Sequence, residues 1–523
     1  MGKIFKHGTS NHAPMIENLK AKPIELETGR NIVVLHEDDA KELGLHPSDR
    51  VKLISPKGTL VAIVDITSKM VQPGEVGTFE EVTKALKLSA GDPVTIAPTS
   101  RPRSIDFIKK KMDGHQLTEE EISAIIDDIV AGNLSQTEMM AFVVAQYIRD
   151  MTMDEIVALT KKMVETGDRL ELDVSPVLDV HSIGGVPGNK YALVTVPIVA
   201  AAGLVVPKTS SRAITSAAGT ADVMEVLANV TLSLEEIKRI VEKVGAVLAW
   251  GGAVRLAPAD DILINTERTI GIDPRSQLLA SVMSKKLAVG ADHVLIDIPM
   301  GQGAKVECME AARALAHDFM ELGHRLGIVV ETAVTYGGQP VGYAVGPALE
   351  AKEALETLEG GGPGSLIEKA TSLAGIMLES GGVTAYGMGK QVALEILRSG
   401  KAREKMREII EAQGGDPNVR SEDIPVGDKK VVVVAPHDGY ITDIINQHIV
   451  AIARAAGAPR DKGAGVKIVL KKGHKVNKGE PLFEIYAEHE KRLDEALALA
   501  KRCPPIRIEG MLLEKISTRP RLG

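Results

Sequence analysis

The sequence predicts a multidomain α/β protein, and three observations support this fold class. The chain has 523 residues, which is too long for one hydrophobic core and indicates about two to four domains. Residues 105–167 have the spacing of amphipathic helices. After residue 175, apolar strand-like runs alternate with glycine-rich turns and helical segments, a pattern typical of a parallel sheet covered by helices.

The charge balance argues against a nucleic-acid partner. The chain contains 70 Asp and Glu against 62 Lys and Arg, so its net charge is −8 and only a local basic cluster could bind anions. The two cysteines, Cys308 and Cys503, lie far apart without the spacing of metal ligands, so we expect neither a disulfide framework nor a metal site. This cysteine usage fits a reducing, cytoplasmic location.

No segment is expected to enter a membrane. Residues 1–23 lack the apolar core of a signal peptide, and we expect them to form a tail. The apolar stretch 191–206 is interrupted by Pro197 and is shorter than the roughly 20 residues that a membrane-spanning helix needs.

An internal repeat predicts a small, pseudo-symmetric β-barrel-like domain over residues 24–97. The stretch DDAKELGLHPSDRVKLI (38–54) is echoed by EVTKALKLSAGDPVTIA (81–97), and each copy contains a short helix, a turn and a β-branched strand. A repeat of about 43 residues that occurs only twice fits a barrel better than a solenoid. Residues 97–104 contain two prolines and are expected to form a linker.

A helical domain is predicted over residues 104–175, joined by a later return of the chain at about 255–288. Three amphipathic stretches are each expected to begin after a cap residue, namely Thr118, Ser135 and Thr152, with acidic residues or Gln in the first turn. Their methionines and apolar stripes are interpreted as core packing.

Residues 176–254 together with about 289–413 are predicted to form a central α/β domain. Four strand-like runs are each followed by a glycine- or hydroxyl-rich turn: PVLDV (176–180), LVVPK (204–208), HVLIDI (293–298) and GIVVETAVT (327–335). In such a parallel or mixed sheet the turns gather at the carboxyl ends of the strands, where ligands usually bind.

A polar linker over residues 414–430 precedes a C-terminal α+β domain at 430–523. The strand-like runs here are separated by Gly and Asn turns. The stretch GHKVNKGEPLFEIYAEHE (473–490) resembles the barrel-sandwich shape of lipoyl carriers, but it lacks a carrier lysine at a hairpin tip. A structural role is therefore expected.

Two loops are candidates for binding phosphate. The glycines of HSIGGVPGNK (181–190) could let backbone N–H groups approach an anion, or they could simply make a tight turn. The stretch fits neither the dinucleotide-binding nor the P-loop pattern. KTSSRAITSAAGTADVMEV (208–226) follows an apolar strand and combines hydroxyl groups with Arg212. Two such loops after successive strands favour a phosphate site over a chance cluster of surface residues.

These loops carry a resemblance to the thymidine/pyrimidine nucleoside phosphorylase family. SSRAITSAAGTADVMEV (210–226) is similar to the pattern S-G-R-G-L-x-x-T-x-G-T-x-D-x-L-E of that family, and HSIGGVPGN (181–189) resembles its phosphate loop. LAPADD (256–261) and LLASVMSKKLAVGADHVLIDI (278–298) match two further stretches. The resemblance covers about residues 104–523.

This chain differs from the nucleoside enzymes at several positions, and at these positions it resembles the archaeal branch of the family, the AMP phosphorylases. The members of that branch also carry an extra N-terminal domain. Ile183, Asn189 and Ser216 replace a Thr, an Asp and a His, and Pro187 is inserted. The resemblance implies phosphorolysis of AMP to adenine and ribose 1,5-bisphosphate, with CMP and UMP as possible substrates.

The resemblance also implies the site residues. Asp273 would be the proton donor, acting as a general acid on the departing base provided that its surroundings keep it protonated. Without the resemblance, Asp273 before Pro274 would be interpreted as a surface turn. Residues implied to bind substrate or phosphate are Gly185, Ser211, Arg212, Ala213, Ile214, Thr215, Ser216, Thr220, Ser281, Lys285 and Lys305.

No cofactor or metal is expected, because amides and basic side chains suffice for two phosphate groups and inorganic phosphate is a co-substrate. His181 is interpreted as a packed loop residue. The resemblance further implies a homodimer formed through the helical domain, which assembles into a larger homo-oligomer with help from the barrel, and a cleft between the helical and α/β domains that closes by a hinge motion.

Three alternatives stay open at this point. One is a pyrimidine nucleoside phosphorylase, and another is a phosphoribosyltransferase of the anthranilate type, which would need an acidic Mg²⁺-binding motif that the sequence lacks. The third is a non-catalytic assembly protein that uses its terminal domains as scaffolds.

Overall fold

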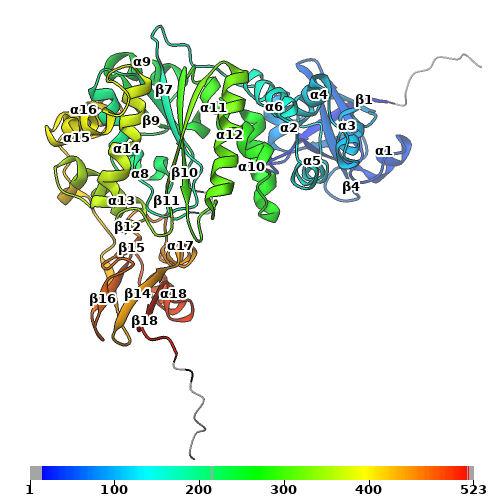
Figure 1. Ribbon diagram of the computed structural model, residues 1–523. Helices are drawn as coiled ribbons and strands as arrows, with labels where there is room; N and C mark the ends of the chain where they lie inside the picture. Colours follow the sequence, from blue (N-terminus) through cyan, green and yellow to red (C-terminus); the bar gives the residue numbers. More distant parts are fainter. Residues whose placement is uncertain (1–14, 214–215, 515, 517–523) are drawn as a thin grey trace, which may run out of the picture. The chain divides into compact units, whose positions relative to one another are not determined.

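The computed structural model describes residues 15–213, 216–514 and 516, and the chain forms two compact units. The first unit comprises the chain up to residue 166 together with 258–280, and the second comprises 167–257 together with 281–523. Figure 1 shows their helices and strands. Among the described residues, no helix has an apolar stretch long enough to cross a membrane.

Six strands of the first unit close into a barrel, as the internal repeat predicted. Their order around the barrel is β1-β5-β2-β4-β3-β6. The two copies of the repeat supply α1 with β3 and α2 with β6, and β3 pairs antiparallel with β6. Apolar side chains from all six strands fill the interior. The elements are β1 (Ile16–Pro23), β2 (Ile32–His36), α1 (Glu37–Glu42), β3 (Arg50–Ser55), β4 (Gly58–Thr67), β5 (Glu75–Thr78), α2 (Glu80–Ala85) and β6 (Pro93–Pro98).

The prediction of a tail over residues 1–23 is wrong for residues 16–23. These residues form β1, which pairs in parallel with β5 and antiparallel with β6. Within β1 only Leu19 and Ala21 are buried. Two apolar positions among charged neighbours are a weak signal for a strand, and the partner strands lie far away in the sequence. Residues 1–14 lie outside the described residues.

Helices complete the first unit. α4, α5 and α6 begin at the expected residues Thr118, Ser135 and Thr152, and each start is a capping box with a Glu three residues later. Arg50 of the barrel donates a hydrogen bond to the carbonyl of Asn133 at 2.9 Å and pairs with Glu138, which fastens the barrel to this bundle. The helices are α3 (Ser104–Met112), α4 (Glu119–Val130), α5 (Gln136–Arg149), α6 (Met153–Glu165) and α10 (Pro258–Ile270).

The second unit is built on parallel strands in the order β11-β10-β7-β8-β9. β10 pairs with both β7 and β11, β8 pairs with β9, and a parallel bridge between Val177 and Val205 joins the two groups. β9 was not predicted from the sequence, although Gly245 ends the preceding helix in a left-handed conformation just before the apolar run. The strands are β7 (Leu178–Ser182), β8 (Val206–Ser210), β9 (Ala246–Trp250), β10 (His293–Met300) and β11 (Val329–Tyr336).

Helices cover this sheet, as expected for an α/β domain. α12 and α14 both contact β10 and β11 and lie on either side of them in Figure 1. The helices are α7 (Ala192–Ala201), α8 (Thr220–Met224), α9 (Leu234–Val244), α11 (Arg275–Ala288, which begins in the first unit), α12 (Met309–Leu326), α13 (Pro347–Leu358), α14 (Gly364–Ser380), α15 (Gly389–Arg398) and α16 (Lys401–Ala412), with short 3-10 turns at Gly251–Ala253 and Ser421–Asp423.

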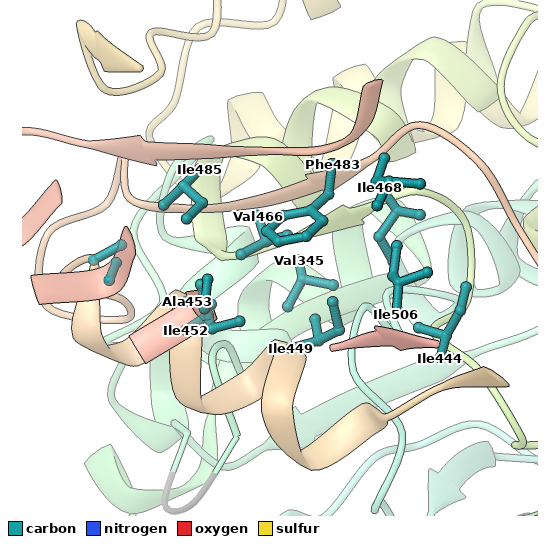
Figure 2. Packing of buried hydrophobic residues seen from close by; sticks show 14 of the residues in the cluster. Val345, Ile444, Ile449, Ile452, Ala453, Val466, Ile468, Phe483, Ile485 and Ile506 are labelled. Atoms are coloured by element: carbon teal, nitrogen blue, oxygen red, sulfur yellow. The ribbon is translucent and has the colours of Figure 1, made fainter. Parts of the chain in front are cut away.

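The C-terminal part contains two antiparallel sheets and two helices. Strand β12 enters it from the α/β part, pairs with β15, and contributes Val345 to a core with Val466, Phe483 and Ile449 (Figure 2). The two parts are therefore packed together through a shared core. The elements are β12 (Ala344–Val345), β13 (Lys429–Val434), β14 (Gly439–Ile444), α17 (Asn446–Ala455), β15 (Gly465–Ile468), β16 (Lys475–Val476), β17 (Pro481–Ala487), α18 (Glu490–Arg502) and β18 (Ile506–Glu509).

A buried ion pair lies inside the helical bundle of the first unit. The ammonium group of Lys111 donates hydrogen bonds to both carboxylate oxygens of Glu155, at 2.9 and 3.0 Å. Glu155 also accepts hydrogen bonds from the backbone N–H groups of Leu117 and Thr152. Because the carboxylate is fully satisfied only when all these donors are present, this pair connects α3, α6 and the start of α4.

Replacing Lys111 with Met is expected to destabilise the first unit by roughly 3–5 kcal/mol, since Glu155 would remain buried without its counter-charge. Hydrogen exchange of the amides of α3 and α6 would measure the loss, with β7 and β10 as an internal reference. Lys109→Met is the matched control, because the ion pair of Lys109 with Asp106 on the same helix is exposed. Equal effects of the two substitutions would contradict this account.

Candidate functional site

The strand order of the second unit creates a topological switch point between β7 and β10. From β7 the chain adds β8 and β9 on one side, and it then returns to β10 on the other side of β7 and continues to β11. In parallel α/β sheets, ligands bind at such a point, between the loops that leave the carboxyl ends of the two central strands. Here these loops contain Gly185 and Lys305, two of the predicted site residues.

The two loops meet at Gly185. Its φ is +86°, and a Cβ atom on it would lie 2.5 Å from the backbone nitrogen of Lys305 and 3.0 Å from the Cβ of Lys305. Both the left-handed backbone and the close approach therefore require glycine. Gly184 has a similar φ of +85°, but a Cβ atom there would meet nothing within 4 Å.

The other end of the same loop is held by Lys190, whose side chain is fully buried. Its ammonium group donates hydrogen bonds to the carbonyls of Gly188, Val341 and Ala344, each at 3.0 Å, and pairs with Glu353 at 2.6 Å. The loop is thus fixed at both ends, by Lys305 on one side and by the segment before α13 on the other.

Positive charge gathers around the carboxyl end of β7. Burial is the main reason that the pKa of His181 lies well below its usual value, and the charges of four lysines lower it further. Those lysines are Lys286 and Lys285 of α11, Lys208 of β8, and Lys305 of the loop after β10. His181 is therefore neutral, and its surroundings favour an anion.

Asp179 neutralises one of these lysines. Its carboxylate lies 2.6 Å from the ammonium group of Lys286, and both side chains are buried. The pairing fixes the end of α11 against β7.

Arg212 has acidic partners in this structure. Its guanidinium group donates to Glu225 at 2.5 and 2.6 Å, lies 3.4 Å from Asp222, and stacks on the ring of Trp250 at 4.7 Å. The hydrogen bond from Arg212 is the main favourable cause that lowers the pKa of Glu225 to about 2, and Lys462 adds to it. The sequence predicted a phosphate fork here and did not foresee these partners.

Asp222 organises the rest of the hydroxyl-rich loop. It accepts hydrogen bonds from the backbone N–H groups of Ala213 at 2.6 Å and of Gly219 at 3.0 Å. Ser211 is exposed, Ser216 donates to the carbonyl of Ala218, and Thr220 is the first residue of α8. Ile214 and Thr215 lie outside the described residues.

Three of the remaining predicted residues lie along α11 or just before it, and the fourth, Lys305, lies in the loop after β10. Ser281 and Lys285 are half-buried positions of this helix in the second unit, and Lys305 is exposed. Asp273 is exposed and belongs to the first unit, two residues before the helix begins.

Comparisons with known proteins match almost the whole chain. AMP phosphorylases from Thermococcus sibiricus and Thermococcus kodakarensis are 58% and 59% identical over 498 residues, covering 95% of this chain and 99% of each relative. AMP phosphorylase 1 from Archaeoglobus fulgidus is 52% identical over 96% of this chain and 99% of its own length. The chain belongs to the AMP phosphorylase family.

Four family models match successive parts of this AMP phosphorylase family member. They are described as a glycosyl transferase helical bundle domain (105–167), a glycosyl transferase a/b domain (174–403), a pyrimidine nucleoside phosphorylase C-terminal domain (440–507) and a "Molydopterin dinucleotide binding domain" (12–100). The last match falls on the barrel. Anthranilate phosphoribosyltransferase from Thermus thermophilus is also similar, with a TM-score of 0.49 and 23% identity, covering 59% of this chain and 99% of that structure.

Sequence reasoning gave no specific role to two buried charged residues, Asp179 of β7 and Lys208 of β8. Lys208 was noticed only as part of a hydroxyl-rich loop, and Asp179 follows Leu178 in an apolar run. A charged residue at the end of a strand is commonly solvated, so burial of both side chains could not be read from the pattern. Lys286 was not among the predicted site residues.

We expect Gly185→Ala to weaken the binding of inorganic phosphate by at least about tenfold, because the added Cβ would displace the backbone of Lys305. Isothermal titration calorimetry with phosphate would measure this. Gly184→Ala is the matched control, since it introduces the same left-handed strain without a steric contact, worth roughly 1 kcal/mol of stability. Equal phosphate affinities of the two variants would show that contact with Lys305 is unimportant.

Proposed function

We propose that this chain catalyses the phosphorolysis of AMP, in which AMP and inorganic phosphate give adenine and ribose 1,5-bisphosphate. The observation that carries the proposal is the 51–59% identity, over about 95% of the chain, to archaeal relatives named AMP phosphorylase. The enzyme would be a pentosyltransferase, which agrees with the match of residues 174–403 to a glycosyl transferase a/b domain.

The basic cluster at the switch point supports this chemistry. Phosphorolysis needs a phosphate dianion held close to C1′ of the ribose while the glycosidic bond breaks, and AMP brings a second phosphate group. Lys285 and Lys305 would provide positive charge for these groups, and Gly185 would let the backbone approach them closely.

The hydroxyl-rich loop would bind the nucleotide. We propose contacts from the backbone and hydroxyl groups of its residues, and from Ser281 on α11. In this role Arg212 would exchange a carboxylate oxygen of Glu225 for a phosphate oxygen, because a guanidinium group binds both with the same bidentate geometry. The loop residues are Ser211, Arg212, Ala213, Ile214, Thr215, Ser216 and Thr220.

Asp273 would donate the proton that adenine needs in order to leave. The ring nitrogen of the base takes up negative charge as the glycosidic bond breaks, and a carboxylic acid within hydrogen-bonding distance can neutralise it. The exposed position of Asp273 before α11 leaves its carboxyl accessible to a ligand.

No redox or electrophilic cofactor is needed for this reaction, since phosphate itself is the nucleophile. Assembly into a homo-oligomer, and the use of the barrel in that assembly, stay predictions. A pyrimidine nucleoside phosphorylase is the second candidate, and the observation in its favour is the match of residues 440–507 to the C-terminal domain of that family.

We expect AMP plus phosphate to yield adenine and ribose 1,5-bisphosphate faster than thymidine, uridine or adenosine yield their bases. Product analysis by chromatography, with AMP, CMP, UMP and the three nucleosides in parallel, tests this and ranks the bases. Omitting phosphate is the control and should abolish product formation. Faster turnover of nucleosides than of 5′-nucleotides would favour the second candidate.

Asp273→Asn is expected to lower kcat by on the order of 100-fold or more, while the affinity for AMP changes little, as for the loss of a general acid. Single-turnover kinetics and calorimetric binding of AMP would separate the two effects. Asp113→Asn, at another exposed position of the first unit, is the control for nonspecific effects of the substitution. Unchanged turnover of the Asp273 variant would remove this residue from the mechanism.

A further inference from the structure

The first turn of α11 is attached to the helical bundle of the first unit by polar side chains. Arg275, Ser276 and Gln277 are the first three residues of this helix. Ser276 and Gln277 are 0% and 1% exposed. A helix that packs into a bundle usually buries apolar side chains, so two successive buried polar residues at its start are unusual.

Two of these residues contact the last turn of α5. The hydroxyl group of Ser276 donates a hydrogen bond of 3.0 Å to Oε1 of Gln146, which is 1% exposed. At the surface, the guanidinium group of Arg275 lies 3.2 Å from the carboxylate of Asp150, the C-cap residue of α5. Asp150 has a left-handed backbone with a φ of +53°, which few residues other than glycine adopt. The end of α5 and the start of α11 are thus joined by one buried and one exposed contact.

Gln277 contacts α10 instead. Its Nε2 group donates a hydrogen bond of 3.2 Å to the carboxylate of Asp260, and both side chains are buried. In the described part of the chain, Oε1 of Gln277 and Nε2 of Gln146 are buried without a hydrogen-bond partner. Buried atoms of this kind cost stability, so apolar side chains at these positions would stabilise the bundle at least as well. What the polar contacts add is direction, because the strength of a hydrogen bond depends on its angle.

Asp273, the proposed proton donor, lies directly before this attached turn. Only Pro274 separates Asp273 from α11, and Pro274 is buried and accepts a hydrogen bond of 2.9 Å from the backbone N–H group of Leu278. A shift or rotation of the first turn of α11 would therefore move the carboxyl group of Asp273 as well. A displacement of about 1 Å is enough to slow a reaction that depends on the placement of a catalytic group.

We propose that Gln146 and Ser276 are positioning residues for Asp273. Their buried hydrogen bond fixes the first turn of α11 on α5, and this holds the carboxyl group of Asp273 where the departing base receives its proton. Because both side chains are buried, they act through the backbone at the start of α11 and not by contact with the substrate. The inference rests on the proposed function, in which Asp273 is the general acid.

The double substitution Gln146→Met with Ser276→Ala tests this inference, because it removes both partners and leaves neither of them unpaired. We expect kcat for AMP phosphorolysis to fall by at least about tenfold, while KM for AMP changes less than about twofold. The midpoint of thermal unfolding should fall by less than about 5 °C. Unchanged kcat of the double variant would overturn the inference.

Thr160→Val is the matched control for the loss of a buried hydroxyl group. Thr160 is 0% exposed and belongs to the same bundle, but its hydroxyl group donates at 2.7 Å to the carbonyl of Ile156 within its own helix, α6. Its removal should leave kcat unchanged. A loss of kcat equal to that of the double variant would show that any buried hydroxyl of the bundle matters as much, and would overturn the inference.

A double-mutant cycle with Asp273→Asn separates positioning from a general loss of structure. If Gln146 and Ser276 act through Asp273, their double substitution should change kcat by less than about twofold in the Asp273→Asn protein, because the acid that they position is already absent. A loss by the same factor with and without Asp273 would show that the pair only supports the fold, and the inference would fall.

Ser276→Ala alone is a second variant that removes a single oxygen atom, and it should lower kcat by at least about threefold. The proposed function is tested separately by the unmodified protein. If the unmodified protein releases no adenine from AMP and phosphate, the proposed function and the inference both fall. If it does so, and the Ser276→Ala and double variants have the same kcat, the inference alone falls.

Discussion

The second unit depends on the buried ammonium group of Lys190. This one group donates hydrogen bonds to three backbone carbonyls and pairs with the carboxylate of Glu353, and its partners come from the Gly185 loop, from β12 and the segment just before it, and from α13. Glu353 in turn accepts hydrogen bonds from the backbone N–H groups of Tyr343 and Ala344. Since each group satisfies the others, removal of either charge would strand several buried polar atoms.

The same contacts connect the Gly185 loop with the C-terminal part. The residue after Ala344 is Val345, which forms the second position of β12 and packs in the C-terminal core with Val466 and Phe483 (Figure 2). Because β12 pairs with β15, the position of the loop around Gly185 is set by a continuous path of hydrogen bonds and packed side chains that ends in another part of the unit. This explains how a loop so rich in glycine can hold one conformation.

The features that could be predicted from the sequence are those that depend on residues close together in the chain. The capped helices, the barrel repeat and the alternation of strands with glycine-rich turns all follow from residues that are close in the sequence, whereas Gly185 was singled out through the family resemblance of its loop. β1 was missed because its pairing partners are distant and its buried residues are only Leu19 and Ala21.

The sequence could not show which charged side chains pair with one another. Asp179 gave no signal, and Lys208 was noticed only as part of a hydroxyl-rich loop, because burial of a charged side chain depends on which distant elements fold over it, here α11 and β7. The role of Arg212 as a fork for phosphate stays a prediction, and its acidic partner Glu225 and its stacking on Trp250 emerge only in three dimensions.

The partners of Arg212 are compatible with a role in binding substrate, for an electrostatic reason. Glu225 also pairs with Lys462 of the C-terminal part at 2.6 Å, so its carboxylate keeps a counter-charge when Arg212 moves to another anion. Asp222, which holds the backbone of Ala213 and Gly219, lies 3.7 Å from the same lysine. Exchange of Arg212 between Glu225 and a phosphate group would therefore leave no carboxylate without a cation, and the fold of the loop would be preserved by Asp222 throughout.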